Sequence, residues 1–588
     1  MCLSMMTGLP PDELSTFSKK KQTWRPTANF KGLARGRDYV STRQDCKWRF
    51  LPILVLLNHR LRGGEGAFAF LFGHPPPRHG PGQADCIFLM IESLPTFRCN
   101  RGTRPTRMKL ALALLLPLAS LAADSLPDPA GVTAAMKKAT AFCTSKLANH
   151  GGYASAWSRD MSMAKVEGHE SKTVISIQPP GTTTLGLVWV KAFQATGDEQ
   201  FLDAARGAAK ALAECQLASG GWGSDFDFEP EAAKKYYLHQ QALAGDAAAG
   251  KRKNLSTLDD NKTQSALRFL LELAHLPECR DDKSLQDCLK FGLDSLLAAQ
   301  YPNGGWPQQF DAPADPATPV LKAAYPKTWS RTFPKVNYVS FYTLNDGNMQ
   351  KVVDLLLRAH ELTGDERFLN AAKKTGDFFI LAQMPEPQPG WAQQYNHQME
   401  PVWARKFEPP CVTGGESLGA MSTLHELYVV TGDEKYLKPL PAAFAWYEKS
   451  RLPDGMYARF YELQTNKPLY FVKDTYELTY SDANMPTHYG FKLDDLEDDI
   501  AALRELVKKP REELLAKRSG PASEKSWTSK AKGAAKKVTT ALTMQQPEGY
   551  WLKGDEIDAG EFSKHLMAMA NYLEAAKKGG ETFAKQRR

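Results

Sequence analysis

QLASGGWGSDF (Gln216–Phe226) and QYPNGGWPQQF (Gln300–Phe310) decide the fold, because the same phrase recurs in both. After a helix-like run comes a glutamine, then a Gly-Gly pair with an aromatic residue, then an irregular stretch before the next helix-like run. QMPEPQPGWAQQY (Gln383–Tyr395) is a degenerate copy. Repeats of this length indicate stacked copies of one supersecondary unit, since a single unit cannot bury its apolar face alone.

Pairs of helix-like segments surround these phrases. Each segment has apolar residues at i, i+3, i+4 and i+7. Between partners, the tripeptide Thr-Gly-Asp at Thr196, Thr363 and Thr431 supplies a C-cap glycine and an N-cap acid. The predicted pairs are 182–197 with 199–216, 261–275 with 284–300, 348–364 with 366–383, 416–432 with 434–450, and 494–509 with 529–545.

One unpaired helix remains at each end, at 131–148 and 560–577, and pairing these two would close a ring. The sequence therefore predicts an all-α fold, an α/α toroid of repeated helical hairpins. A linear superhelix of hairpins is the alternative, but such arrays keep their loops short, so the long Gly-aromatic loops favour the toroid. Two excursions interrupt the pattern: 311–337, and 457–471, where TNKP indicates a small β-hairpin.

The N-terminal part resembles a misplaced start followed by an export signal. MKLALALLLPLASLAAD begins at Met108 with one lysine, an apolar run and small residues, which is the layout of a secretory signal peptide. We therefore expect a mis-annotated or disordered leader at 1–107, a signal peptide at 108–123, and a catalytic domain at 124–588 in a secreted or periplasmic protein. The alternative is a genuine basic extension before an internal anchor. The apolar run is too short to span a bilayer.

The charge balance changes once the leader is set aside. The whole chain has 74 Lys and Arg against 66 Asp and Glu, a net charge of +8, but residues 1–107 hold 17 of the basic and 7 of the acidic residues. The signal segment holds one more basic residue, Lys109, so 56 basic and 59 acidic residues remain from Asp124 onward, a net charge of −3. The basicity of the whole chain is therefore no evidence for a nucleic-acid partner. Of the cysteines in this part, Cys279 and Cys288 are either a disulfide or buried free thiols.

The predicted helix starts hold acids at equivalent positions. TLDDNKT, TLNDGNM and TGGES place Asp260, Asp346 and Glu416 at the starts of three helices, and the toroid would bring these starts to one mouth. Carboxylates with amides such as Asn261 make an oxygen cluster suited to Ca²⁺. The alternative for each acid is that it only caps its helix.

Basic side chains form a second cluster. Arg405 stands among aromatic residues and prolines in PVWARKFEPP, and Arg459 and Lys473 lie on the predicted hairpin arm. Guanidinium groups beside aromatic rings suit an acidic sugar, because the fork binds a carboxylate and the ring covers a sugar face. A surface arginine stacked on an aromatic ring for packing is the alternative.

Several long motifs resemble one known family. VISIQPPGTTTLGLVWVKAFQATGDEQFLDAA, LDDNKTQSALRFL, QYPNGGWPQQF, NDGNM, WARKFEPP and YARFYELQTNKPLYFVKD are together similar to family 10 of the polysaccharide lyases, the α/α-toroid pectate lyases. The resemblance runs from about Val174 to Asp474 and less clearly to Lys577. It implies cleavage of polygalacturonate (pectate) by Ca²⁺-dependent β-elimination.

The resemblance also implies roles for single residues. Arg405 would be the general base. Asp260 and Asp346 match acidic positions that would hold Ca²⁺. Asp260 would also bind substrate, together with Asn261, Arg459 and Lys473, to which we add Glu416. The family usually has arginine where Lys473 stands, and lysine keeps the charge but loses the bidentate geometry. A cationic neighbourhood is expected to lower the pKa of the Arg405 guanidinium, so that activity rises with alkaline pH.

Two other functions stay open at this stage. An α/α-toroid glycoside hydrolase acting on a uronic-acid polysaccharide would use two of the carboxylates as acid and base or nucleophile. A non-catalytic uronate-binding protein would keep the toroid and lose turnover. In each case we expect a monomer with a polysaccharide partner, no nucleic acid and no membrane span.

Overall fold

The computed structural model describes residues 126–246, 250–518, 520 and 523–587, all within one compact unit of the chain, Ile91–Arg588. The predicted leader and signal peptide lie outside the described residues. Within the described part, no helix combines the length and the apolar character needed to cross a bilayer.

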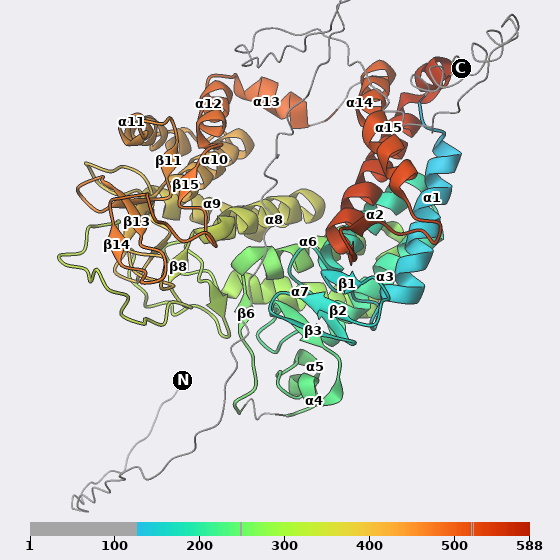
Figure 1. Ribbon diagram of the computed structural model, residues 1–588, viewed down its shortest axis with the longest axis horizontal. Helices are drawn as coiled ribbons and strands as arrows, with labels where there is room; N and C mark the ends of the chain where they lie inside the picture. The colour runs from blue at the N-terminus through green and yellow to red at the C-terminus, as the bar shows by residue number, and fades with distance from the viewer. Residues whose placement is uncertain (1–125, 247–249, 519, 521–522, 588) are drawn as a thin grey trace, which may run out of the picture. The chain divides into compact units, whose positions relative to one another are not determined.

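The helices form two series that alternate along the chain (Figure 1). What we call the inner series is α2 (Thr182–Thr196), α6 (Lys262–Ala274), α8 (Asn348–Thr363), α10 (Gly414–Thr431), α12 (Leu496–Val507) and α15 (Ala559–Arg587). The outer series is α1 (Pro129–Phe142), α3 (Glu199–Glu214), α7 (Lys283–Ala298), α9 (Glu366–Ala382), α11 (Leu440–Ser450) and α14 (Glu524–Met544). Neighbours in the inner series pack on one another from α15 through α2, α6, α8 and α10 to α12. This is the predicted α/α toroid.

The glutamine of each repeated phrase links successive outer helices. Its side-chain amide donates to the carbonyl four or six residues later in its own loop and to a carbonyl at the next outer helix. The second acceptors are Cys288 for Gln216, Ala371 for Gln300 and Pro439 for Gln383. The phrase that defines the repeat in the sequence is therefore also the joint between units.

The same joint connects the two ends of the helical series. Gln545, at the end of α14, donates to Gly549 in its own loop and to Ala135 in α1, so the last repeat binds the first helix. Gly549 has φ of 114°, and a Cβ there would lie 2.7 Å from the backbone oxygen of Lys138. In addition α1 packs against α15, which confirms the predicted pairing of the two end helices.

The Thr-Gly-Asp turns between partner helices have the predicted caps. Gly197, Gly364 and Gly432 end α2, α8 and α10 in the left-handed conformation. The following acids cap the next helices: Asp198 accepts from the backbone N–H of Gln200, and Asp365 accepts from that of Arg367.

Short strands hold the starts of the inner helices. β4 (Val174–Ser176), β6 (Ser256–Thr257), β8 (Tyr342–Thr343) and β10 (Cys411–Thr413) each lead into one inner helix. Their antiparallel partners are β5 (Asp225–Asp227), β7 (Gln309–Phe310), β9 (Gln394–Tyr395) and β12 (Phe460–Glu462). The first three of these partners lie at the end of the repeated phrase. Four helix starts are thus fixed in the same way.

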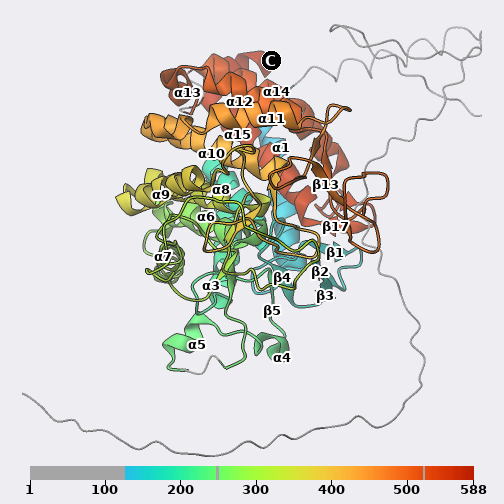
Figure 2. The ribbon, with the colours of Figure 1, turned by 90° about the vertical axis from the view of Figure 1, so that its left-hand side faces the viewer.

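The remaining strands belong to a four-stranded sheet, a five-stranded sheet and one two-stranded pair. The predicted hairpin is β12 with β13 (Pro468–Phe471), in a sheet of order β10–β12–β13–β14, where β14 is Leu478–Thr479. A second sheet has the order β16–β17–β1–β2–β3, with β16 at Leu552–Lys553, β17 at Glu556–Asp558, β1 at Ala156–Ser158, β2 at Ala164–Val166 and β3 at His169–Ser171. β11 (Tyr457–Ala458) pairs with β15 (Lys492–Leu493). In Figure 2, β1, β2, β3, β13 and β17 lie to the right of α7, α9 and α10.

Some predicted elements differ from the observed ones. The segment 434–450 is split at Pro439 into a 3₁₀ helix η5 (Glu434–Leu437) and α11, because proline lacks an N–H and favours the start of a helix. The predicted pairing of 494–509 with 529–545 is wrong: α12 packs on α10, whereas α14 packs along α15. The end of the predicted helix 131–148 is the π-helix η1 (Cys143–Leu147). Not predicted were α4 (Pro230–Ala233), α5 (His239–Leu243), the 3₁₀ helix η3 (Pro277–Cys279) and α13 (Arg511–Arg518).

The described cysteines Cys143, Cys215, Cys279, Cys288 and Cys411 are all buried and free. Of the two alternatives for Cys279 and Cys288, the free thiols are therefore confirmed.

Candidate active site

The starts of the inner helices meet at one mouth, as predicted. A pocket of about 260 Å³ is lined by Thr183 and Thr184 of α2 and by Asn261 before α6. A second pocket, of about 180 Å³, is lined by Asp346 before α8 and by Glu416 of α10. From α2 to α10, neighbouring helix starts therefore share either a pocket or, between α6 and α8, a cluster of carboxylates.

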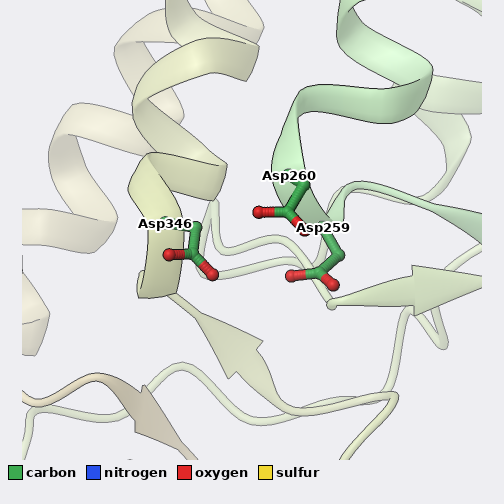
Figure 3. Close-up of side chains that lie close together, drawn as sticks. All are labelled: Asp259, Asp260 and Asp346. Atoms are coloured by element: carbon green, nitrogen blue, oxygen red, sulfur yellow. The ribbon is translucent and has the colours of Figure 1, made fainter. Parts of the chain in front are cut away.

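Asp259, Asp260 and Asp346 form this carboxylate cluster (Figure 3). One carboxylate oxygen from each residue lies within 4.8 Å of those from the other two. The cluster brings together the two predicted metal positions, Asp260 and Asp346. Its oxygen-only donors suit a hard cation such as Ca²⁺.

Two turns of the same backbone shape present the cluster. In the 3₁₀ turn η2 (Asp259–Asn261), Asp260 and Asn261 have φ of 48° and 64°; in η4 (Asn345–Gly347), Asp346 and Gly347 have φ of 53° and 66°. An aspartate in the left-handed region is strained, and such strain persists where the surroundings impose it, often at functional sites.

Helix capping does not explain Asp260 or Asp346. The N-cap residues of α6 and α8 are Asn261 and Gly347, and in the described part of the chain neither helix start has a side-chain cap. The Asp346 carboxylate instead accepts a hydrogen bond of 2.7 Å from the side chain of Asn345. The capping alternative is therefore wrong for these two acids.

Asp346 carries a charge that its surroundings compensate poorly. Solvent reaches its side chain, but the carboxyl lies in a depression of the mouth where protein replaces part of its hydration. Burial, followed by the charges of Asp260, Asp259 and Glu416, raises the pKa of Asp346 to about 6. A bound cation would relieve this repulsion, so the residues fit the group that the family resemblance implies.

Arg405 is held by a buried carboxylate that the sequence analysis missed. Its guanidinium donates to Glu408 at 2.5 Å, and its backbone N–H donates to the other oxygen of Glu408 at 3.0 Å. Gln393 donates to the same carboxylate at 2.7 Å. The guanidinium lies 5.0 Å from the ring centre of Phe407. These contacts fix the position of a side chain that remains one-third exposed.

The sequence predicted a lowered pKa for Arg405, but the protein's own residues, without a bound cation, raise it. Burial by itself lowers the pKa of Arg405, but the hydrogen bond and charge of Glu408 raise it more, so the net pKa lies above the usual range of arginine. The expectation considered only cations around Arg405, whereas the nearest charge is a carboxylate.

Arg459 and Glu416 face each other across the second pocket, which Asp346 also lines. Nη1 of Arg459 lies 3.8 Å from Oε1 of Glu416, and the guanidinium stacks 4.4 Å from the ring centre of Tyr489. Glu416 is buried, and its Oε2 has no hydrogen-bond partner among the described residues. Both predicted substrate-binding positions thus belong to the mouth that holds the cluster.

Lys473 does not line the pocket of Arg459 and Glu416. It follows β13, its side chain is exposed, and its backbone N–H donates to Asn484. Within residues 126–587 as described, no ion pair or hydrogen bond of its ammonium group is found.

The excursion 311–337 reaches the segment that carries Arg405. Trp403 donates to the backbone oxygen of Ser330 at 2.7 Å and packs against Phe333. Arg331 forms an ion pair with Glu462 of β12, which ties the excursion to the hairpin.

The first acid of LDDN, Asp259, and the acid three residues after Arg405, Glu408, were visible in the motifs. Asp259 and Glu408 were nevertheless not selected, because only the fold shows that the first joins the cluster and the second binds the guanidinium.

Comparison with known proteins gives a family match for the part of the chain that carries the cluster. Residues 227–457 match the family model described as pectic acid lyase. The resemblance to a polysaccharide lyase family is thereby confirmed over this range. It contains Asp259, Asp260, Asp346, Arg405 and Glu408, whereas Arg459 lies just beyond it. No curated protein matches the chain.

Solved structures with similarity to this pectic acid lyase-like chain are distant. One is a family 10 polysaccharide lyase from Cellvibrio cellulosa, at 18% identity over 55% of this chain and 98% of that chain, with a TM-score of 0.38. Another is a family 76 glycoside hydrolase (mannosidase) from Bacteroides thetaiotaomicron, at 10% identity over 76% and 98%, with a TM-score of 0.37. A cellobiose 2-epimerase from Spirochaeta thermophila DSM 6192 has 13% identity over 56% and 73%, with a TM-score of 0.34. At this similarity we infer no function from them.

Proposed function

We propose that this protein is a pectate lyase that cleaves polygalacturonate by Ca²⁺-dependent β-elimination. The observation that carries the proposal is the carboxylate cluster, whose Asp346 shares a pocket with Arg459 and lies within range of the charge of Arg405. The cluster and Arg405 belong to the region that matches the pectic acid lyase family. Oxygen donors for a hard cation and guanidinium groups for uronate carboxylates together suit an anionic sugar polymer.

The chain's own residues would share the work as follows. Asp259, Asp260 and Asp346 would hold the cation. When bound, Ca²⁺ supplies Lewis-acid polarisation of the uronate carboxylate, which acidifies the proton on C5. Arg459, whose guanidinium is positioned by Tyr489, would bind and orient a uronate.

Arg405 would take the proton from C5 of a galacturonate. The electron pair of the C5–H bond then forms the C4–C5 double bond, the C4–O4 bond breaks with its pair on O4, and the leaving oxygen is protonated from solvent. Glu408 would position Arg405, because it binds both its guanidinium and its backbone N–H. Asn261, Glu416 and Lys473 stay proposals as substrate-binding residues.

A direct test is to incubate the purified protein with polygalacturonate, with Ca²⁺ or with a chelator. We expect products that absorb near-ultraviolet light through their new double bond, and only when Ca²⁺ is present. New reducing ends without this absorbance would contradict the lyase. Binding of the polymer without any cleavage would instead indicate a uronate-binding protein.

One observation favours a second candidate, an α/α-toroid glycoside hydrolase. A general acid of such an enzyme needs a carboxyl with a raised pKa next to an ionised carboxylate. Asp346, with its pKa of about 6 beside Asp260, meets this description. The absorbance test separates the two candidates, since hydrolysis creates no double bond.

Glu408→Gln tests the base directly. Because the Glu408 carboxylate raises the pKa of Arg405, glutamine should lower that pKa while still accepting a hydrogen bond. A base must be deprotonated to act, so wild-type activity should rise throughout the alkaline range, and the profile of Glu408→Gln should rise at lower pH. The measurement is kcat against pH. An unshifted profile would mean that Arg405 acts as a cation.

The proposal also covers the location and the oligomeric state of the enzyme. We propose that residues 108–123 export it to the periplasm or the medium, where polygalacturonate is accessible, and that residues 124–588 act as a monomer.

A further inference from the structure

Lys262 lies directly against the carboxylate cluster. It is the first residue of α6, and only 6% of its side chain is exposed. Its ammonium donates to Oδ2 of Asp259 at 3.3 Å and lies 3.6 Å from Oδ2 of Asp260. A lysine is rarely buried unless it is paired, and here both partners belong to the candidate cation site.

Local structure does not favour a lysine at this position. The N-terminus of a helix carries a partial positive charge, so a cation in its first turn is unfavourable. The corresponding position of α8, after the turn of the same shape, holds a neutral residue: Asn348 accepts a hydrogen bond from Gln264 at 3.0 Å. The same turn thus leads into α8 without a lysine at the first position of the helix, which points to a role for the charge of Lys262.

We propose that Lys262 is a built-in counter-ion that sets the cation affinity of the cluster. In the metal-free protein its ammonium offsets one of the negative charges and keeps Asp259 and Asp260 paired. A cation that enters the cluster must share these carboxylates with the ammonium or displace it. Since the charge of the ligand set tunes Ca²⁺ affinity, Lys262 weakens the binding. This inference rests on the proposed cation site.

The test is the Ca²⁺ dissociation constant of the full chain, measured by titration calorimetry without polysaccharide. We expect Lys262→Met to bind Ca²⁺ about tenfold more tightly than the wild type. Lys262→Asn, which copies the residue at the start of α8, should show the same gain and guards against a failure of the methionine variant to fold.

Lys351→Met is the matched control. Lys351 is a lysine of the same mouth, but its ammonium donates to the backbone oxygen of Asp346 at 2.6 Å and not to a carboxylate. Its removal deletes the same charge without freeing a ligand, so we expect a gain below about threefold.

Unchanged or weaker Ca²⁺ binding in both Lys262 variants would overturn the inference and leave Lys262 as a structural ion-pair partner. If the wild type also forms unsaturated products only with Ca²⁺, the proposed function would stand while the role of Lys262 fails. If no variant and no wild-type protein binds Ca²⁺, both fail.

Discussion

Replacing Arg405 by lysine is expected to abolish turnover almost as completely as replacing it by alanine. A purely electrostatic role would survive the lysine with about a tenfold loss, or about 1.4 kcal/mol of barrier. A positioned base would lose about a thousandfold or more, because the lysine nitrogen lies elsewhere and the fork that binds Glu408 is gone. The measurement is kcat on polygalacturonate at alkaline pH, together with polymer affinity, which should be largely retained.

The alanine variant needs a control for folding. Removing the guanidinium leaves the carboxylate of Glu408 buried without its charged partner, which is costly. The double variant Arg405→Ala with Glu408→Gln removes this charge and should fold with wild-type secondary structure while staying inactive. By contrast, Arg459→Ala should weaken polymer binding as well as rate.

A nearly normal rate in Arg405→Lys would mean that the base lies elsewhere. His488 would then be the first residue to test. Burial and the charges of Arg405 and Lys406 lower its pKa, so its ring is neutral at working pH, and the ring packs against Phe407.

Asp346→Asn should lower the activity of the protein but raise the stability of its metal-free form. We expect Ca²⁺-dependent turnover to fall about a hundredfold or more and the rise in Tm on adding Ca²⁺ to be lost. At pH 8 the metal-free variant should nevertheless be more stable than the wild type by roughly 1 kcal/mol. This is less than the full pKa shift implies, because solvent screens the carboxyl.

The sign follows from the raised pKa of Asp346, about 6 against an ordinary value of 3.8. Protonation stabilises the fold, and this contribution is present below about pH 4 and lost as the pH rises through 6. The stability difference between Asp346→Asn and the wild type should therefore vanish at about pH 4. Thermal unfolding at both pH values in the presence of a chelator checks this.

Asp365→Asn is the matched control, since Asp365 caps α9 and lies between partner helices. We expect its turnover and its response to Ca²⁺ to stay near wild type, with any stability change within the usual range of a cap, at most about 2 kcal/mol. If Asp346→Asn behaved like this control, Asp346 would have only a structural role.

The sequence by itself determined the repeating architecture, because the signals are local and recur. The glutamine of each phrase binds its own loop and the next outer helix, as Gln216 and Gln545 do at two distant joints. The Thr-Gly-Asp turns need only neighbouring backbone groups for their caps. Helix periodicity then placed Asp260, Asp346 and Glu416 at equivalent helix starts, and hence at one mouth.

Only the tertiary structure decided which distant helices pack together and which charged side chains lie close to one another. The pairing of α12 with α10 depends on packing between segments far apart in the chain, and periodicity does not report it. Glu408 is close to Arg405 in sequence, but its effect on the guanidinium comes from burial, which a motif does not reveal. The raised pKa of Asp346 likewise arises from carboxylates on another turn, because repulsion depends on distance in space rather than along the chain.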